Sequence, residues 1–378
     1  MSTMQVQNQG QRRIACIQLD SRHADVAGNT ETVLTLASKL IAENKSSPIN
    51  LLVLPELALT GYVFKSRDEI DPYLEDARLF KPPEAVYLDQ TVPTFLTACR
   101  SSSTCSKQPS LTLAAHLAQQ LHCYVVIGFP ELGSHRLSNQ TTASVDDLIG
   151  PPFDARPHPE KDAKVPIPAP ADGHEQSYAF NSAALVAPDG SLKHVFRKHF
   201  LFETDQGWAS EGEGFEAIHL PGLGNVCIAI CMDLNPFRFR TDFKSCELAS
   251  FCVEKDIDML VMPMAWLLPT DEQVKSSGHM EPLSKPGPSL STINYWALRC
   301  LPFFDTQHPA TLPAESGSLS SPRPKVKYLI ANNRTGTEAS SMFAGSSCVL
   351  EMKLGERPLL LQSLGTTEQT CLVATLPV

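Results

Sequence analysis

Three residues of reactive types stand at the ends of predicted strands. Cys231 follows the apolar run 226–230, Glu56 follows the apolar run 50–55, and Lys198 follows the second arm of a predicted β-hairpin. Open α/β sheets place their functional groups at strand ends. A cysteine at a sharp corner after a strand can expose its sulfur while the backbone N–H groups beyond it stay open, as a covalent nucleophile requires. The three residue types together therefore indicate nucleophilic catalysis by a thiol.

The chemistry of such a set follows from the side chains. A free thiol has a pKa of about 8.5 and is only slightly ionised at neutral pH, so Cys231 needs a base. Glu56 can take that proton and later deliver it to departing ammonia, provided that burial raises the pKa of its carboxyl group. Lys198 and the backbone N–H of Met232 can stabilise the oxyanion that forms when the sulfur attacks an amide carbon. Applied to an amide, this chemistry is hydrolysis through a thioester on Cys231.

Each of the three residues also has an ordinary structural explanation. Free cysteines usually pack as small buried side chains. Glu56 can serve as a carboxylate at a helix N-terminus, and Lys198 can be a solvated hairpin residue. The catalytic interpretation is favoured because all three types occur in order, each at a strand end.

Composition excludes several classes of function. The 378 residues carry a formal net charge of −10 without a Lys/Arg cluster on a periodic face, so nucleic acid and anionic membranes are not expected partners. The 11 cysteines are scattered without a C-x₂-C spacing, which supports neither a disulfide framework nor a zinc site. Residues 1–11 are polar, and no apolar run approaches the length of a membrane span. We therefore expect a cytoplasmic protein with mostly reduced thiols.

Alternating strands and helices must position the reactive residues. Continuous apolar runs predict buried strands, and apolar positions three and four apart predict amphipathic helices. A hairpin interrupts the alternation, so the class is α/β with mixed sheets. We expect one domain over residues 10–378, with Pro-rich surface insertions near 134–174 and 305–325. The predicted strands are 13–19, 50–55, 123–128, 183–186, 192–196, 226–230, 257–264, 326–331, 343–350 and 371–376, and the predicted helices are 29–41 with Asn29 or Thr30 as cap, 111–121, a helix capped by Asp242, and 290–301.

Three segments resemble the Glu-Lys-Cys signature of the nitrilase superfamily of carbon-nitrogen hydrolases. They are 54–62 around Glu56, 196–198 ending in Lys198, and 230–233 around Cys231. Segments 181–183 and 333–338 also match features of that superfamily, so the resemblance covers nearly the whole chain. It implies the four-layer α-β-β-α sandwich of the nitrilase type, with mixed sheets.

Two segments, 231–236 and 262–266, are most similar to the fungal protein N-terminal amidases. That resemblance implies removal of the side-chain amide from an N-terminal Asn or Gln, which leaves Asp or Glu and releases ammonia. The acidic product would then be read by an N-terminal degradation (N-degron) pathway. The implied partners are protein or peptide N-termini, with a homodimer as a further possibility. No metal or organic cofactor is implied, because the triad accounts for every chemical step.

One position departs from the family pattern. Many members carry a second glutamate just before a Gly-Trp pair, and here Gln206 precedes Gly207 and Trp208. Glu203 and Asp205 are the alternatives for that role.

A free α-amino group should meet polar acceptors near the pocket, and Asp205, Gln206 and Asp233 are candidates by position. Both aspartates could equally be structural caps. Trp266 either forms a wall of the pocket or belongs to the core.

Two other functions remain open on the sequence. The first keeps the chemistry and changes the substrate, as in a small-molecule amidase, carbamoylase or ω-amidase of the same superfamily. The second is an inactive nitrilase-like scaffold. The scaffold is less favoured because all three triad types are present.

Overall fold

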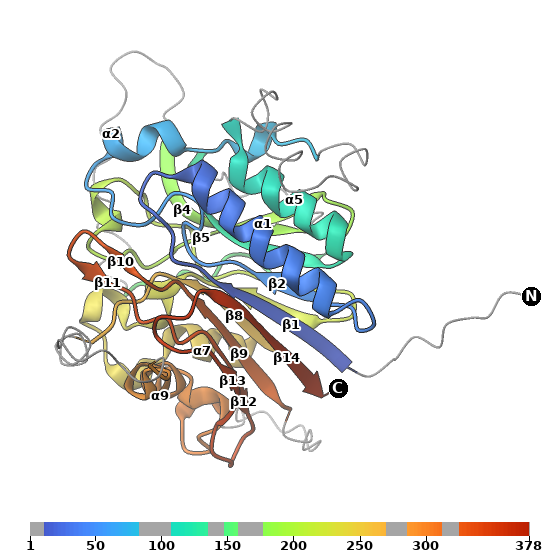
Figure 1. Ribbon diagram of the computed structural model, residues 1–378. Helices are drawn as coiled ribbons and strands as arrows, with labels where there is room; N and C mark the ends of the chain where they lie inside the picture. Colours follow the sequence, from blue (N-terminus) through green and yellow to red (C-terminus); the bar gives the residue numbers. More distant parts are fainter. Residues whose placement is uncertain are drawn as a thin grey trace, which may run out of the picture.

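A computed structural model describes residues 11–82, 107–134, 147–157, 177–269, 286–311 and 325–377. Two six-stranded mixed sheets form the centre of this part of the chain (Figure 1). In the first sheet, β1, β2 and β3 run parallel, and antiparallel strands flank them on both sides. Its order is β14 (Thr370–Pro377), β1 (Gln11–Gln18), β2 (Leu51–Val53), β3 (Tyr124–Gly133), β4 (Tyr178–Val186) and β5 (Leu192–Arg197).

The second sheet repeats this arrangement. Its central strands β7, β8 and β9 are parallel, and its outer neighbours are antiparallel. Its order is β13 (Leu359–Ser363), β12 (Cys348–Met352), β9 (Lys327–Asn333), β8 (Met259–Met264), β7 (Gly224–Ile228) and β6 (Ala217–Leu220). A separate two-stranded ribbon joins β10 (Thr337–Glu338) to β11 (Ser341–Met342).

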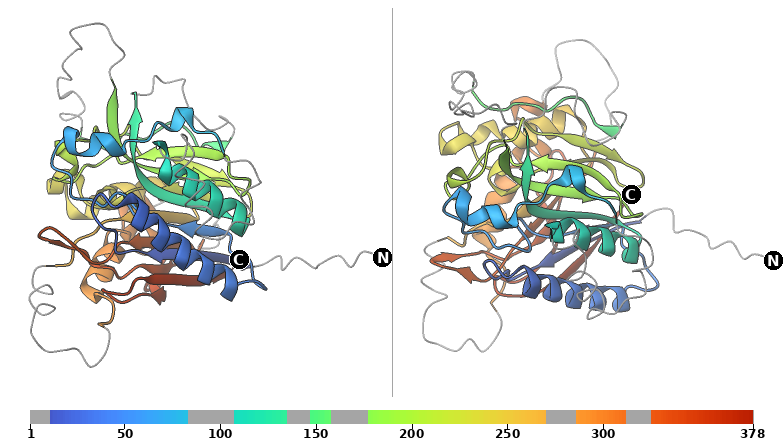
Figure 2. Two further views of the ribbon diagram at one scale, coloured as in Figure 1. Left: turned by 45° about the horizontal axis from the view of Figure 1, so that its top comes forward. Right: turned by 90° about the horizontal axis from the view of Figure 1, so that it is seen from above.

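Helices cover the outer faces of the two sheets. Figures 1 and 2 show α1 and α5 side by side over the first sheet, and α7 and α9 on the opposite side of the molecule, over the second. The α-helices are α1 (Val26–Glu43), α2 (Arg67–Ile70), α5 (Pro109–Leu121), α7 (Glu247–Glu254) and α9 (Leu290–Leu298). Short 3₁₀ helices span Asp71–Tyr73, Ala77–Leu79, Asp205–Gly207, Cys231–Leu234, Phe237–Phe239, Phe243–Ser245, Leu301–Phe303 and Pro309–Thr311. None of the helices described here is long and apolar enough to cross a membrane.

Alternate side chains of β1 show how the layers are held together. Ile14 and Cys16 lie in the core between the two sheets, whereas Ala15 and Ile17 lie in the core beneath α1 and α5. A strand sends successive side chains to opposite faces, so a continuous apolar run suits a sheet that is covered on both sides. The predicted four-layer α-β-β-α sandwich with mixed sheets is confirmed.

Several predicted boundaries differ from the structure. The first helix begins at Val26, because the Asp25 side chain accepts a hydrogen bond from the N–H of Gly28 and caps it there. Asp242 caps only a short 3₁₀ helix, since Cys246 has a φ of 43° and separates that helix from α7. Strand β12 starts at Cys348 rather than at the predicted residue 343. Four strands, β6, β10, β11 and β13, had no predicted counterpart.

Most of the two predicted insertions lies outside the described residues. Within the first, residues 147–157 are described, and Phe153 exchanges backbone hydrogen bonds of 2.8 and 2.9 Å with Phe215. This part of the segment therefore packs against the second sheet. The single domain over residues 10–378 stays a prediction, which the pairing of β14 with β1 supports.

Candidate active site

The three predicted catalytic residues converge where the two sheets meet. Glu56 follows β2 and Lys198 follows β5 in the first sheet, whereas Cys231 follows β7 in the second. Glu56 and Lys198 have no exposed surface, and Cys231 is 7% exposed. The packing of one sheet on the other therefore assembles the set, and its catalytic role stays a prediction.

Both oxygens of the Glu56 carboxylate are held in place. Oε1 accepts hydrogen bonds from Nζ of Lys198 at 2.6 Å and from Nδ2 of Asn181 at 2.7 Å. Oε2 accepts one from the backbone N–H of Ala265 at 2.7 Å. A Cβ on Gly128 of β3 would lie 2.5 Å from the Cα of Glu56, so only glycine permits this close approach of β3. The carboxylate therefore has a fixed orientation.

Asp205 takes the place expected for the second glutamate. Its Oδ2 lies 2.6 Å from Nζ of Lys198, and its Oδ1 accepts a hydrogen bond from Nδ2 of Asn181 at 3.0 Å. A short 3₁₀ helix turns Asp205 inward, while Gln206 is exposed. Of the two acidic alternatives, Asp205 contacts Lys198 and Glu203 is exposed. The lysine is thus shared between two buried carboxylates.

Burial and charge set the protonation of this cluster. Burial raises the pKa of Glu56, and the nearby ammonium group of Lys198 opposes that rise. Burial disfavours the charge of Lys198, but Asp205 and Glu56 outweigh that cost and hold its pKa well above the usual value. Burial, together with the charge of Glu56, raises the pKa of Cys231 well above that of a free thiol. The cysteine therefore rests as a thiol that needs a base.

Cys231 lies at a strained backbone corner between β7 and a 3₁₀ helix. Its φ of 42° falls in the left-handed region that non-glycine residues rarely adopt. The Asp233 carboxylate fixes this corner, since Oδ2 accepts a hydrogen bond from the N–H of Ile230 at 2.8 Å. Oδ1 accepts hydrogen bonds from the N–H groups of His199 and Phe200 at 2.9 and 2.7 Å. Asp233 therefore ties the segment after β5 to the corner that presents the thiol.

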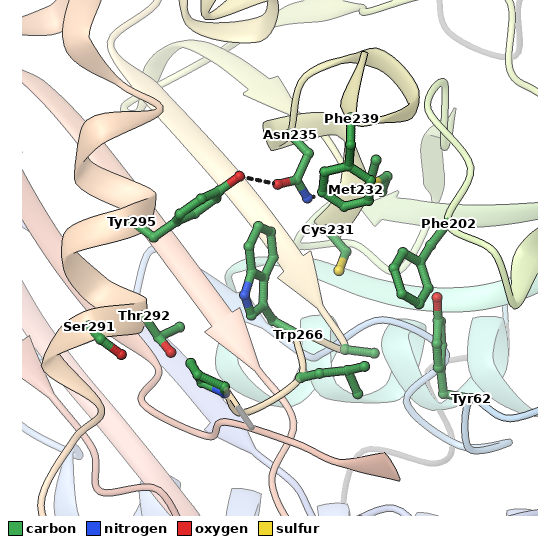
Figure 3. Close-up of a pocket in the computed structure, with 13 residues that line it drawn as sticks. Tyr62, Phe202, Cys231, Met232, Asn235, Phe239, Trp266, Ser291, Thr292 and Tyr295 are labelled. Atoms are coloured by element: carbon green, nitrogen blue, oxygen red, sulfur yellow. Dashed lines mark hydrogen bonds between the residues drawn. The ribbon is translucent and has the colours of Figure 1, made fainter. Parts of the chain in front are cut away.

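The sulfur of Cys231 faces a cavity of about 460 Å³ (Figure 3). In this view Trp266 lies between Cys231 and Tyr295 of α9. The hydroxyl group of Tyr295 donates a hydrogen bond to Oδ1 of Asn235 at 2.6 Å, which fixes the far wall. The lining residues are mostly aromatic and apolar: Tyr62, Phe202, Cys231, Met232, Asn235, Phe239, Ala265, Trp266, Leu267, Pro269, Ser291, Thr292 and Tyr295.

Of the four residues predicted to bind substrate, Trp266 lines the cavity. Asp205 is engaged by Lys198, Asp233 is engaged by backbone N–H groups, and Gln206 is exposed. The geometry of the cavity therefore does not support a substrate-binding role for Asp205, Gln206 or Asp233. Within the described ranges, no group of three or more His, Cys, Asp and Glu side chains is placed to hold a metal ion.

Sequence reasoning gave no individual role to Asn181, although its segment contributed to the family resemblance. The signal was available, because a buried amide in the mostly apolar strand β4 needs hydrogen-bonding partners. Tyr295 carried no such signal. It reaches the cavity only because α9 packs beside Trp266.

Segment 333–338, which matches features of the nitrilase superfamily, holds part of the structure near the cavity in place. The Glu338 carboxylate accepts hydrogen bonds from the backbone N–H groups of Tyr62 and Val63, at 3.0 and 2.6 Å, and pairs with Arg334 at 2.5 Å. Tyr62 is a lining residue, so this carboxylate fixes one wall.

Replacing Asn181 with leucine should lower kcat about tenfold and move the acid limb of its pH profile upward. The amide donates to Glu56 and lowers the pKa of that carboxyl group, so its loss raises the pKa. Glu56 must be ionised to act as a base. With a raised pKa it becomes protonated at a higher pH as the solution is acidified, so activity is lost earlier. The measurement is kcat against pH, with Ser182→Ala as control, because Ser182 donates instead to Glu131. An unshifted acid limb in Asn181→Leu would contradict this role.

Comparisons with known proteins identify relatives in sequence and in fold. The family model described as carbon-nitrogen hydrolase matches residues 13–145. A protein N-terminal amidase of Schizosaccharomyces pombe is 28% identical in an alignment of 319 residues, which covers 81% of this chain and 80% of that protein.

Two solved structures of an N-terminal amidase share the fold. The one with an Asn-Glu peptide has a TM-score of 0.65 at 19% identity and covers 98% of this chain and 99% of that chain. The one with a Gln-Val peptide has a TM-score of 0.64 at 19% identity and covers 97% and 99%.

Proposed function

We propose that this chain, whose residues 13–145 match the carbon-nitrogen hydrolase family, removes the side-chain amide of an N-terminal Asn or Gln. The products are Asp or Glu and ammonia. The observation that carries this proposal is the buried Lys198, held 2.6 Å from both Glu56 and Asp205, in the same cluster as a cysteine that opens into a cavity. Two findings support this substrate class. A protein N-terminal amidase is similar to most of this chain, and solved N-terminal amidase structures with Asn and Gln peptides share its fold.

The first half of the reaction forms a thioester. Glu56 accepts the proton of the Cys231 thiol, and the sulfur attacks the side-chain amide carbon. The ammonium group of Lys198 has three N–H donors, two of which face carboxylates among the described residues, so the third can donate to the oxyanion. The backbone N–H of Met232 is the second donor. Glu56 returns its proton to the nitrogen, the C–N bond breaks, and ammonia leaves.

The second half releases the acid. Glu56, again ionised, takes a proton from a water molecule that attacks the thioester carbon, and the same donors stabilise the second oxyanion. The C–S bond breaks and the thiol of Cys231 recovers the proton. Burial of Glu56 suits both halves, because a raised pKa lets one carboxyl group act as base and as acid.

The test is ammonia release from a short peptide that begins with Asn. Controls are the same peptide with an acetylated N-terminus, a peptide with an internal Asn, and free asparagine. Activity on the first alone, abolished in Cys231→Ala, is the expected result. Comparable activity on free asparagine would replace the proposal with a small-molecule amidase. If none of the four substrates releases ammonia, the result would contradict an amidase for N-terminal Asn and favour a scaffold.

We also propose a cellular setting for this reaction. The acidic N-terminus would be read by an N-terminal degradation pathway, and the enzyme would act in the cytoplasm. All nine cysteines within the described ranges are free thiols, which suits a reducing compartment. A homodimer remains a prediction, which sedimentation of the purified protein would test.

A further inference from the structure

We propose that the cavity beyond Cys231 is a subsite for the second residue of the substrate, and that it selects apolar or aromatic side chains there. The inference rests on the proposed function, since it names which N-terminal Asn or Gln peptides are preferred. It deepens that function by assigning specificity to the wall formed by Trp266, Tyr295 and Phe239.

The cavity has room for more than the reacting side chain. Its catalytic end is marked by Cys231 and by Ala265, whose N–H holds the Glu56 carboxylate. From there it extends past Trp266 to Tyr295 on α9 (Figure 3). A volume of about 460 Å³ is that of a site for a small ligand rather than for one carboxamide group.

Chain connectivity places the second residue in this outer part. Consecutive α-carbons lie about 3.8 Å apart, so the second residue stays close to the first when the amide carbon is at the sulfur. It cannot turn toward Glu56 and Lys198, because both are completely buried and already paired. The peptide must therefore continue along the wall that carries Trp266.

The chemistry of this wall favours apolar side chains. None of the described lining residues carries a charged side chain, and Trp266, Leu267 and Tyr295 present apolar surface. An apolar second residue would gain from leaving water here, whereas an aspartate would lose hydration without a cationic partner in the lining. We expect a preference of about 10- to 100-fold in kcat/KM, which is the range for an apolar contact of this size.

Phe239 is the residue that makes this preference testable. It lines the cavity yet is 57% exposed, so it lies at the mouth. Its φ of 54°, like the 50° of the preceding Arg238, belongs to the left-handed region, and such strain often marks functional positions. Asparagine tolerates this conformation, so Phe239→Asn removes the apolar ring without new backbone strain.

The experiment compares two peptides that differ only at the second position, Asn-Leu and Asn-Asp, by ammonia release. The wild-type protein should prefer Asn-Leu by at least about tenfold in kcat/KM. Phe239→Asn should reduce that ratio several-fold, and Phe239→Lys should reduce it further by pairing with the aspartate. The matched control is Leu359→Asn on β13, because Leu359 is 55% exposed and does not line the cavity. It should keep the wild-type ratio.

Two results would overturn the subsite while the amidase stands. One is equal kcat/KM for both peptides, and the other is a ratio that Phe239→Asn and Phe239→Lys leave unchanged. If neither peptide releases ammonia, the proposed function fails. Calorimetry of the same peptides binding to Cys231→Ala then tests the subsite independently of catalysis. Tighter binding of Asn-Leu than of Asn-Asp supports the subsite, and equal or absent binding refutes it.

Discussion

Replacing Glu56 with glutamine should lower kcat by at least about 10³-fold, which lies within the range for loss of a general acid–base group. Glutamine keeps the shape of the side chain and can still accept from Lys198 and Asn181. It cannot take the proton of Cys231 or deliver one to ammonia. The measurement is steady-state ammonia release, together with the rate at which an alkylating reagent labels Cys231, which should also fall.

Glu75→Gln is the matched control for that variant. Glu75 is another fully buried carboxyl group, and burial raises its pKa to about 7. It accepts hydrogen bonds from the backbone N–H groups of Ser110 and Leu111 at the start of α5, and touches no member of the catalytic cluster. Its kcat should stay within a few-fold of wild type. A kcat for Glu56→Gln within tenfold of wild type would rule out Glu56 as the base.

The second large effect is expected from Lys198→Met. Glu56 and Asp205 would lose their shared counter-charge, and removing one partner of a buried ion pair typically costs about 3–5 kcal/mol of stability. One oxyanion donor also disappears, which lowers kcat by about 10²- to 10³-fold. Chemical denaturation and ammonia release measure the two consequences separately.

The pH dependence of Lys198→Met has a definite sign. Without the ammonium group the pKa of Glu56 rises further above its unfolded value, because that group lowers it in the wild-type protein. A carboxyl group with a raised pKa stabilises the folded state most at low pH, and this stabilisation is lost as the pH rises through the folded pKa. The stability deficit of the variant should therefore be smallest in acid. Its residual activity, which needs ionised Glu56, should recover as the pH increases.

A double variant separates structure from catalysis. In Lys198→Met with Asp205→Asn, the second buried charge is gone as well, so part of the lost stability should return. The activity should not return, because the oxyanion donor is still missing. A double variant that regains kcat would show that Lys198 is only a structural counter-ion.

The positions of Glu56, Lys198 and Cys231 after strands were predictable, because apolar runs marked two of these strands and a hairpin pattern marked the third. The role of Asp205 was not. Glu203, Asp205 and Gln206 lie within one short segment, and only the turn of the 3₁₀ helix decides which side chain faces Lys198. Sequence periodicity carries no information on such a turn.

The sequence indicated Trp266 as a candidate wall of the pocket, but it did not reveal the rest of the cavity. Trp266 follows β8 and Tyr295 belongs to α9, and the loop-rich stretch between them gave no indication that they meet. Predicted strand boundaries were wrong near residues such as Ser346, whose φ of 59° is uncommon for residues other than glycine. Tertiary packing imposes these conformations, so local propensity does not reveal them.

The division of the predicted catalytic set between two sheets also bears on how the enzyme is made. Glu56 and Lys198 belong to the first sheet and Cys231 to the second, and the first sheet is completed only when β14 pairs with β1. Strand β14 (Thr370–Pro377) follows all three reactive side chains in the sequence. During synthesis, a growing chain therefore contains Glu56, Lys198 and Cys231 before it contains the strand that completes the first sheet. Catalytic competence should depend on the pairing of β14 with β1, which joins distant parts of the sequence.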